Sequence, residues 1–179
     1  MGMRVRFVLA AVLAASLAGC GSSGPAPLPV ACPNPGLLAD GADLTRYRPG
    51  PVRDLTTLEF DARLAGINGS CRPGRGDRSI DITLTTSFSV ERGAAAQGRT
   101  VDLPWFVAVV GPDEQVLSRQ VFVERVAFGR NETRTTGSSE PVNLSLPVGE
   151  DRRARDYRIF VSFELTPEDL ALNRRRGPR

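Results

Sequence analysis

The chain has 179 residues, of which 41% are hydrophobic and 24% charged, as is typical of one globular domain. All 23 basic residues are arginine and there is no histidine. This excludes Ser-His-Asp and Cys-His nucleophile systems, histidine metal centres, lysine Schiff bases and the lysine-dependent phosphate loop. The formal charge of +3 includes Arg4 and Arg6, which lie in a segment that we expect to be removed; the remaining near-neutral balance predicts no nucleic-acid partner.

The first segment, residues 1–19, has the organisation of a secretory signal peptide. Arg4 and Arg6 form a positive start, and an apolar run rich in Ala, Val and Leu follows from Phe7 to Leu17. The run is shorter than the roughly 20 apolar residues that a transmembrane helix needs. We therefore expect export and removal of this segment.

The apolar run is closed by Leu17-Ala18-Gly19-Cys20, which resembles the lipobox of bacterial lipoproteins. The chain as a whole resembles small proteobacterial envelope lipoproteins. The resemblance implies that the bond before Cys20 is cut and that Cys20 is lipidated on its thiol and its new amine, which gives a firm membrane anchor. Gly21 in place of an aspartate resembles the default for the periplasmic face of the outer membrane. The alternative is an ordinary signal peptide in which Cys20 occurs by chance.

Residues 20–36 are rich in Gly, Ser and Pro and predict an extended tether. The two remaining cysteines, Cys32 and Cys71, are expected to pair, because an exported protein meets an oxidising compartment. Such a disulfide closes a loop of roughly 40 residues. The alternatives are two buried free thiols or a metal site, for which two thiolates without histidine are a poor ligand set.

Residues 37–173 show the alternation of apolar and polar residues that predicts half-buried strands. The segment 101–110 is apolar on both faces and is expected to be a central strand. An apparent change of register after Val123 suggests a β-bulge within 116–128. We expect a turn at 68–70, a loop over 71–78 and a long polar connection over 130–140. The predicted strands cover residues 58–64, 80–90, 101–110, 116–128, 142–148 and 157–165.

A short helix is predicted after the last strand. Thr166 is suited to cap it, Pro167 fits its first turn, and the helix is expected to run to about Arg174. Residues 174–179 form an Arg-rich tail that is either solvated or in contact with an anionic lipid or polymer. The whole pattern predicts an all-β fold, a small immunoglobulin-like β-sandwich of six or seven antiparallel strands with a C-terminal helix.

No residue pattern predicts catalysis, a cofactor or a metal. Carboxylate chemistry on sugars is the one design that the composition leaves open, with Glu59, Asp61 and Asp81 as candidates, although charges on strands are usually solvated faces. Trp105 with Phe106 suggests either a binding platform or core packing.

Three functions remain as hypotheses. The first is a non-catalytic binding or scaffolding module of the cell envelope, with an envelope protein partner that adds a strand to a sheet edge. The second is a periplasmic carrier that holds a small hydrophobic ligand between the sheets. The third is a carboxylate-dependent envelope hydrolase, which needs two acids facing one another in a cleft.

Overall fold

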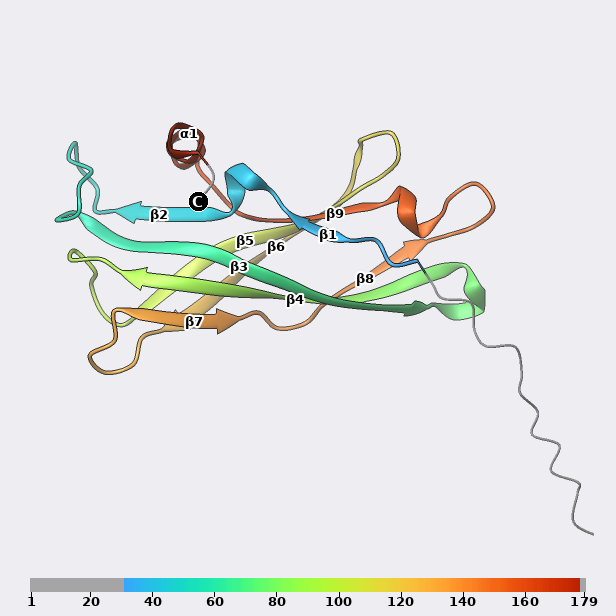
Figure 1. Ribbon diagram of the computed structural model, residues 1–179, viewed down its shortest axis with the longest axis horizontal. Helices are drawn as coiled ribbons and strands as arrows, with labels where there is room; N and C mark the ends of the chain where they lie inside the picture. The colour runs from blue at the N-terminus through green and yellow to red at the C-terminus, as the bar shows by residue number, and fades with distance from the viewer. Residues whose placement is uncertain (1–30, 178–179) are drawn as a thin grey trace, which may run out of the picture.

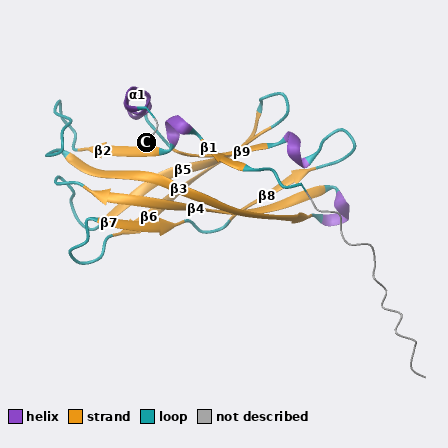
Figure 2. Cartoon of the chain, in the orientation of Figure 1, coloured by secondary structure: helices purple, strands orange, loops and turns teal. Residues whose placement is uncertain are grey.

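The computed structural model describes residues 31–177, in which two β-sheets pack face to face and a single α-helix follows the last strand (Figure 1). Strands make up most of the ordered structure, and the remaining helical segments are 3-10 turns at Ala39–Gly41, Arg75–Asp77 and Ala154–Asp156 (Figure 2). The predicted all-β sandwich with a short C-terminal helix is confirmed. The predicted signal peptide, the lipobox and Cys20 lie outside the described residues.

The first sheet is built around a long hairpin. Strands β3 and β4 pair along almost their whole length, and β2 lies beside β3. On the other side of β4, the strands β7 and β8 pair one after the other with its two halves. The bounds are β2 Asp43–Tyr47, β3 Leu58–Pro73, β4 Ser79–Arg92, β7 Arg134–Ser138 and β8 Val142–Pro147.

The second sheet has the order β1-β9-β5-β6. Strand β5 lies between β9 and β6, which confirms the expectation of a central strand. The pairing of β1 with β9 is parallel, whereas all other pairs in the two sheets are antiparallel. The bounds are β1 Pro35–Leu37, β5 Thr100–Val110, β6 Val116–Ala127 and β9 Arg158–Phe163.

The core lies between the sheets and follows from period-two alternation, since every second side chain of a strand faces inward. Trp105 is 1% exposed; its ring stacks on Phe122 at 4.8 Å and meets Phe88 edge-on at 5.6 Å. Trp105 therefore packs in the core. The largest fully buried side chains are Trp105, Phe88, Phe163, Leu44, Leu84, Leu103, Ile159, Val90, Val107, Val109, Val161 and Thr86.

Two predicted connections are wrong because strands run through them. Strand β3 continues past the predicted turn at 68–70, with a bulge at Ala65 where Leu64 pairs with Phe88 and Gly66 with Ser87. The extra residue inverts the alternation, so Ile67 and Cys71 pack against the core, and the turn moves to residues 74–78. The predicted polar connection over 130–140 contains β7, which is polar because it is an edge strand with little buried surface.

The bulge predicted after Val123 is also wrong. The pairing of β6 with β5 is continuous from Ala127 to Ser118, and the register shifts only near Leu117. Val121 and Val123 are exposed, whereas Val126 and Phe128 are buried, so the two pairs lie on opposite faces of one regular strand.

The strand order differs from that of immunoglobulin constant domains. In those domains the third strand crosses to the second sheet, whereas β3 and β4 here form a hairpin within one sheet. The connection from β1 to β2 carries the chain from one sheet to the other. The folded unit begins before the predicted boundary at residue 37, because β1 starts at Pro35.

Helix α1 spans Pro167–Arg176 and lies beside β2 (Figure 1). Thr166 caps it, as predicted, in a reciprocal pair of hydrogen bonds with Asp169. The helix is two residues longer than predicted. The start of the predicted tail, residues 174–176, therefore belongs to the helix, and Arg174 forms an ion pair with Asp40.

Candidate functional site

The disulfide joins Cys32 to Cys71, with 6.0 Å between the Cα atoms, which confirms the predicted pair. Cys71 lies near the end of β3, beside the turn of the β3–β4 hairpin, and Cys32 precedes β1. The bond fastens the beginning of the described chain to that end of the sandwich. The predicted lipidation site, Cys20, lies outside the described residues. Within residues 31–177 no helix combines the length and apolarity that crossing a bilayer requires.

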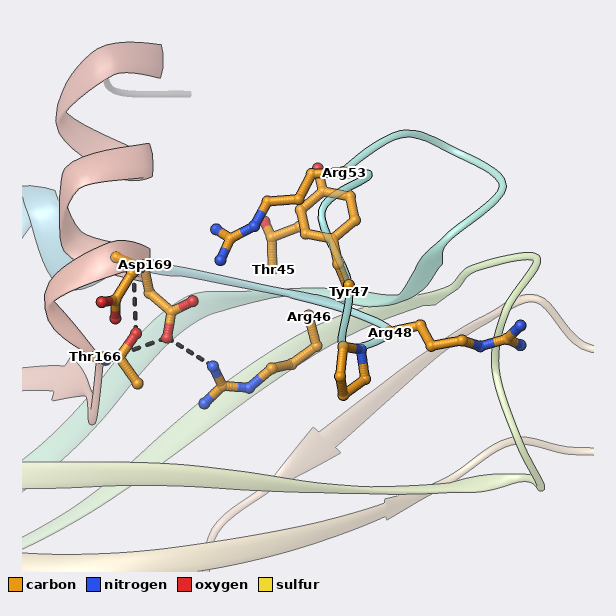
Figure 3. Close-up of a pocket in the computed structure, with 10 residues that line it drawn as sticks. Thr45, Arg46, Tyr47, Arg48, Arg53, Thr166 and Asp169 are labelled. Atoms are coloured by element: carbon orange, nitrogen blue, oxygen red, sulfur yellow. Dashed lines mark hydrogen bonds and ion pairs between the residues drawn. The ribbon is translucent and has the colours of Figure 1, made fainter.

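A shallow hollow of about 170 Å³ lies between the end of β2, the following loop and the first turn of α1 (Figure 3). Arg46 donates from Nη1 to Oδ2 of Asp169 at 2.6 Å, and the same carboxylate oxygen accepts the backbone N–H of Thr166. Arg53 extends from the loop toward the helix (Figure 3). Arg46, one of the three arginines that line the hollow, is thus already paired with a carboxylate.

The helix is held to β2 by polar contacts, since its two buried residues are Asp169 and Asn173. Nδ2 of Asn173 donates to the backbone carbonyls of Asp40 at 2.8 Å and Asp43 at 2.7 Å. Arg176 donates to the hydroxyl of Thr45, and also to that of Tyr47. The polar residues around the hollow therefore serve to hold the helix against β2.

Of the three carboxylates named from the sequence, Glu59 and Asp61 lie two residues apart on one face of β3, whereas Asp81 lies at the other end of the β3–β4 ladder. Asp61 faces Glu91 across the β3–β4 ladder, in a second shallow hollow of about 260 Å³. Asp61 accepts the Thr45 hydroxyl at 2.9 Å, and Glu91 forms an ion pair with Arg134 at 3.1 Å.

Asp81 lies near the other end of β4 and accepts the Ser145 hydroxyl at 2.9 Å, while Glu59 lies near the start of β3. The two carboxylates that face each other across neighbouring strands are therefore Asp61 and Glu91, a pair that the sequence analysis did not name. Among the described residues no group of three or more His, Cys, Asp or Glu is arranged to hold a metal ion.

Both hollows lie at the surface and are lined mainly by polar side chains. Neither is between the two sheets, where the carrier hypothesis places a hydrophobic ligand. That space is occupied by core side chains such as Trp105 and Phe88.

The outer edge of β6 is the most distinctive surface of the described chain. No described strand pairs with β6 on the side away from β5, so the strand forms an open sheet edge up to its C-terminal end, where the Ala127 carbonyl accepts the Thr135 hydroxyl. Four of the seven exposed large hydrophobic side chains among residues 31–177 belong to this strand, with Val121 52% and Val123 64% exposed. The other two are Val116 and Leu117. Long edges with exposed apolar side chains are uncommon because they invite pairing with another chain.

The two arginines that flank the valines, Arg119 and Arg125, form ion pairs with carboxylates of neighbouring strands or loops. Arg125 donates two hydrogen bonds to Asp102, at 2.7 and 2.9 Å, which lowers the pKa of that carboxyl. Arg119 forms an ion pair with Glu164, and its guanidinium lies 4.1 Å from the ring centroid of Phe106. Val121 and Val123 thus lie uncovered between two arginines that are each paired with a carboxylate of the same sheet region.

On the opposite face of β6, burial raises the pKa of Glu124, and repulsion from Glu140 adds to this effect. The edge therefore combines an apolar row on one face with a partly desolvated carboxylate on the other.

Sequence reasoning missed this surface as a candidate site. Val121 and Val123 are visible in the sequence between polar neighbours, but a half-buried strand has the same pattern whichever face it buries. Comparison with protein-family models, with curated proteins and with solved structures finds no match to this chain.

Proposed function

We propose that this protein is a non-catalytic envelope lipoprotein, anchored through Cys20, whose β-sandwich binds an envelope protein by strand addition at β6. The observation that carries the proposal is the open edge of β6 with exposed Val121 and Val123. A partner strand laid along this edge gains backbone hydrogen bonds from the strand and apolar contact from the valines.

The arrangement of the chain supports a tethered role. The disulfide to Cys71 fixes the incoming chain at the end of the sandwich that carries the β3–β4 turn. The edge of β6 belongs to the other sheet, on the side of β6 away from β5. A lipid anchor before Cys32 thus leaves this edge accessible to a partner.

The binding role is tested by quantitative affinity purification of the tagged, full chain from crosslinked envelopes. We compare the wild type with Val121→Lys, which places a charge on the edge, and with Val52→Lys, since Val52 has the same 52% exposure in a distant loop. We expect a discrete partner with the wild type and with Val52→Lys, and at least tenfold lower recovery with Val121→Lys. Equal recovery with both lysine variants would overturn the proposal.

The anchor is tested separately with Cys20→Ala. We expect the variant to leave the membrane fraction and to recover less partner, because the anchor concentrates the domain at the surface where the partner lies. A variant that stays in the membrane fraction as fully as the wild type would contradict lipidation at Cys20.

A further inference from the structure

The exposed part of β6 has a nearly symmetric sequence. Residues 119–125 read Arg-Gln-Val-Phe-Val-Glu-Arg, and reversal of the order changes only Gln120 and Glu124. Two antiparallel strands related by a two-fold axis place residues equidistant from the axis opposite one another. A sequence that is symmetric about Phe122 therefore places like residues opposite one another across such an axis.

We propose that β6 pairs antiparallel with β6 of a second copy of this chain, with the two-fold axis at Phe122. This joins the two four-stranded sheets into one continuous sheet. The inference rests on the proposed function, in which a partner strand pairs with β6. It identifies that partner strand as β6 of a second copy of this chain.

The outer face of the pairing is apolar at its centre. Val121 of each copy lies opposite Val123 of the other, so four side chains that are 52% and 64% exposed in the single chain form one patch. β-Branched side chains pack well against their neighbours on the pleated surface of a sheet. A shift by two residues in one direction places Arg119 opposite Val123, and in the other direction places Val121 opposite Arg125. The first shift leaves Val121 opposite Val121 and the second leaves Val123 opposite Val123, so either shift keeps one valine pair in place of two.

The charges at the two ends of the patch are compatible with this register. Arg119 lies opposite Arg125 of the other copy, and repulsion between the two guanidinium groups would by itself disfavour this pairing. Each guanidinium already has a carboxylate on its own sheet, Glu164 for Arg119 and Asp102 for Arg125. The ends of the patch thus contain equal numbers of cations and anions.

The inner face adds a polar pair. Gln120 lies opposite Glu124 of the other copy, and a glutamine amide is able to donate to a carboxylate. Gln120 is exposed in the single chain, and burial together with repulsion from Glu140 raises the pKa of Glu124. The pairing supplies Glu124 with a donor at a position where burial works against its charge.

The edge is accessible over the symmetric segment. The neighbouring sheet reaches β6 at its C-terminal end, where Thr135 donates its hydroxyl to the Ala127 carbonyl at 3.3 Å and Gly137 packs close to Val126. Residues 119–125 precede these contacts. A second strand is therefore able to lie beside them without displacing β7.

The proposal is tested by sedimentation equilibrium of the full chain in detergent across the micromolar range, with Gln120→Lys and Gln120→Glu as charge variants. In the proposed register each dimer holds two copies of the 120–124 pair. At pH 7 we expect Gln120→Lys to lower the dimer dissociation constant by about tenfold and Gln120→Glu to raise it by about tenfold. Residue 120 is exposed, so thermal unfolding of the three proteins at low concentration should agree.

Two outcomes overturn the proposal: a wild type that stays monomeric across this range, or dissociation constants that do not separate the two Gln120 variants. These outcomes are distinguishable from failure of the proposed function. If Val121→Lys still removes an envelope partner while the wild type is monomeric, β6 binds a different strand. If Val121→Lys changes neither the partner nor the oligomeric state, both proposals fail.

Discussion

Nη1 of Arg46 lies 2.6 Å from Oδ2 of Asp169, and this ion pair joins strand β2 to the C-terminal helix. The two residues are separated by 123 positions in the sequence. The Asp169 side chain is 10% exposed and also accepts the backbone N–H of Thr166 in the helix cap. One carboxylate thus closes the first turn of the helix and fixes the helix to the sheet. Its loss leaves Arg46 partly buried without a partner.

The first prediction concerns this junction. We expect Asp169→Asn to lower the free energy of unfolding by about 1–3 kcal/mol, because it removes a charged acceptor from a mostly buried site. Urea unfolding of the full chain measures the change. Glu168→Gln is the matched control, since Glu168 is exposed in the same turn of the helix, and it should change stability by less than about 0.5 kcal/mol. A loss for Asp169→Asn no larger than that for Glu168→Gln would contradict a stabilising role of the Asp169 carboxylate.

The second prediction concerns the disulfide. Cys32 and Cys71 are separated by 39 positions, and removal of such a cross-link is expected to lower the free energy of unfolding by about 4 kcal/mol through the entropy of the unfolded chain. The double variant Cys32→Ser with Cys71→Ser, compared with the wild type in urea, measures this loss. Addition of a reductant should destabilise the wild type and leave the double variant unchanged. A reductant effect of the same size in both proteins would contradict the assignment.

The third prediction concerns Thr86, which occupies an inward position on β4. Its hydroxyl is buried and has no hydrogen-bond partner among the described residues, while its backbone N–H is satisfied by the Ser139 hydroxyl. Valine has nearly the same shape and lacks the hydroxyl, so Thr86→Val is expected to raise the free energy of unfolding by about 1 kcal/mol. Thermal and urea unfolding measure the change. A destabilised variant would indicate that an ordered water holds the Thr86 hydroxyl.

The fourth prediction concerns the pH dependence of stability. Burial raises the pKa of Glu124 in the folded chain, with Glu140 contributing further, so the folded state holds a proton that the unfolded state gives up above about 4.5. The free energy of unfolding therefore falls as the pH rises from 4.5 through the raised pKa. Glu124→Gln stays neutral, so at pH 7 it should be more stable than the wild type, by roughly 0.5 kcal/mol or less.

The measurement is urea unfolding at pH 3.5 and pH 7, at a protein concentration that keeps the chain monomeric. At pH 3.5 the wild type and Glu124→Gln should have the same stability, because both side chains are then neutral. Asp102→Asn is a control of opposite sign: the hydrogen bonds from Arg125 lower the pKa of Asp102, so its stabilising effect is present above 3.8 and is lost as the pH falls through the lowered value. A pH-independent difference for Glu124→Gln would contradict the prediction.

Several features were predictable because they depend on neighbouring residues. The alternation of Ile80, Ile82, Leu84, Phe88 and Val90 predicted β4 and its buried face, since the sheet period is two and burial follows hydrophobicity. The helix start at Thr166 was predictable for a similar reason, because capping groups act within one turn. The disulfide followed from the count of cysteines once an exported compartment was expected.

The strands β1, β2 and β7 were not predicted because each is short and is stabilised mainly by backbone pairing with a neighbouring strand. β1 and β2 lie on either side of a sheet change, and the polar β7 is held by backbone pairing with β4 rather than by burial. The bulge at Ala65 was equally invisible. It depends on the register between β3 and β4, and it is this bulge that turns Ile67 and Cys71 toward the core.

The sequence by itself determined that the chain folds as an all-β domain with one short helix and a disulfide, because alternation, capping and cysteine pairing are local or countable properties. Only the tertiary structure decided which strand is left at an edge. Val121 and Val123 have the same pattern as the inward residues of β5, and they are exposed because β6 is outermost and buries Phe122 and Val126 instead. Strand order is set by pairing between distant segments, which no single segment of the sequence encodes.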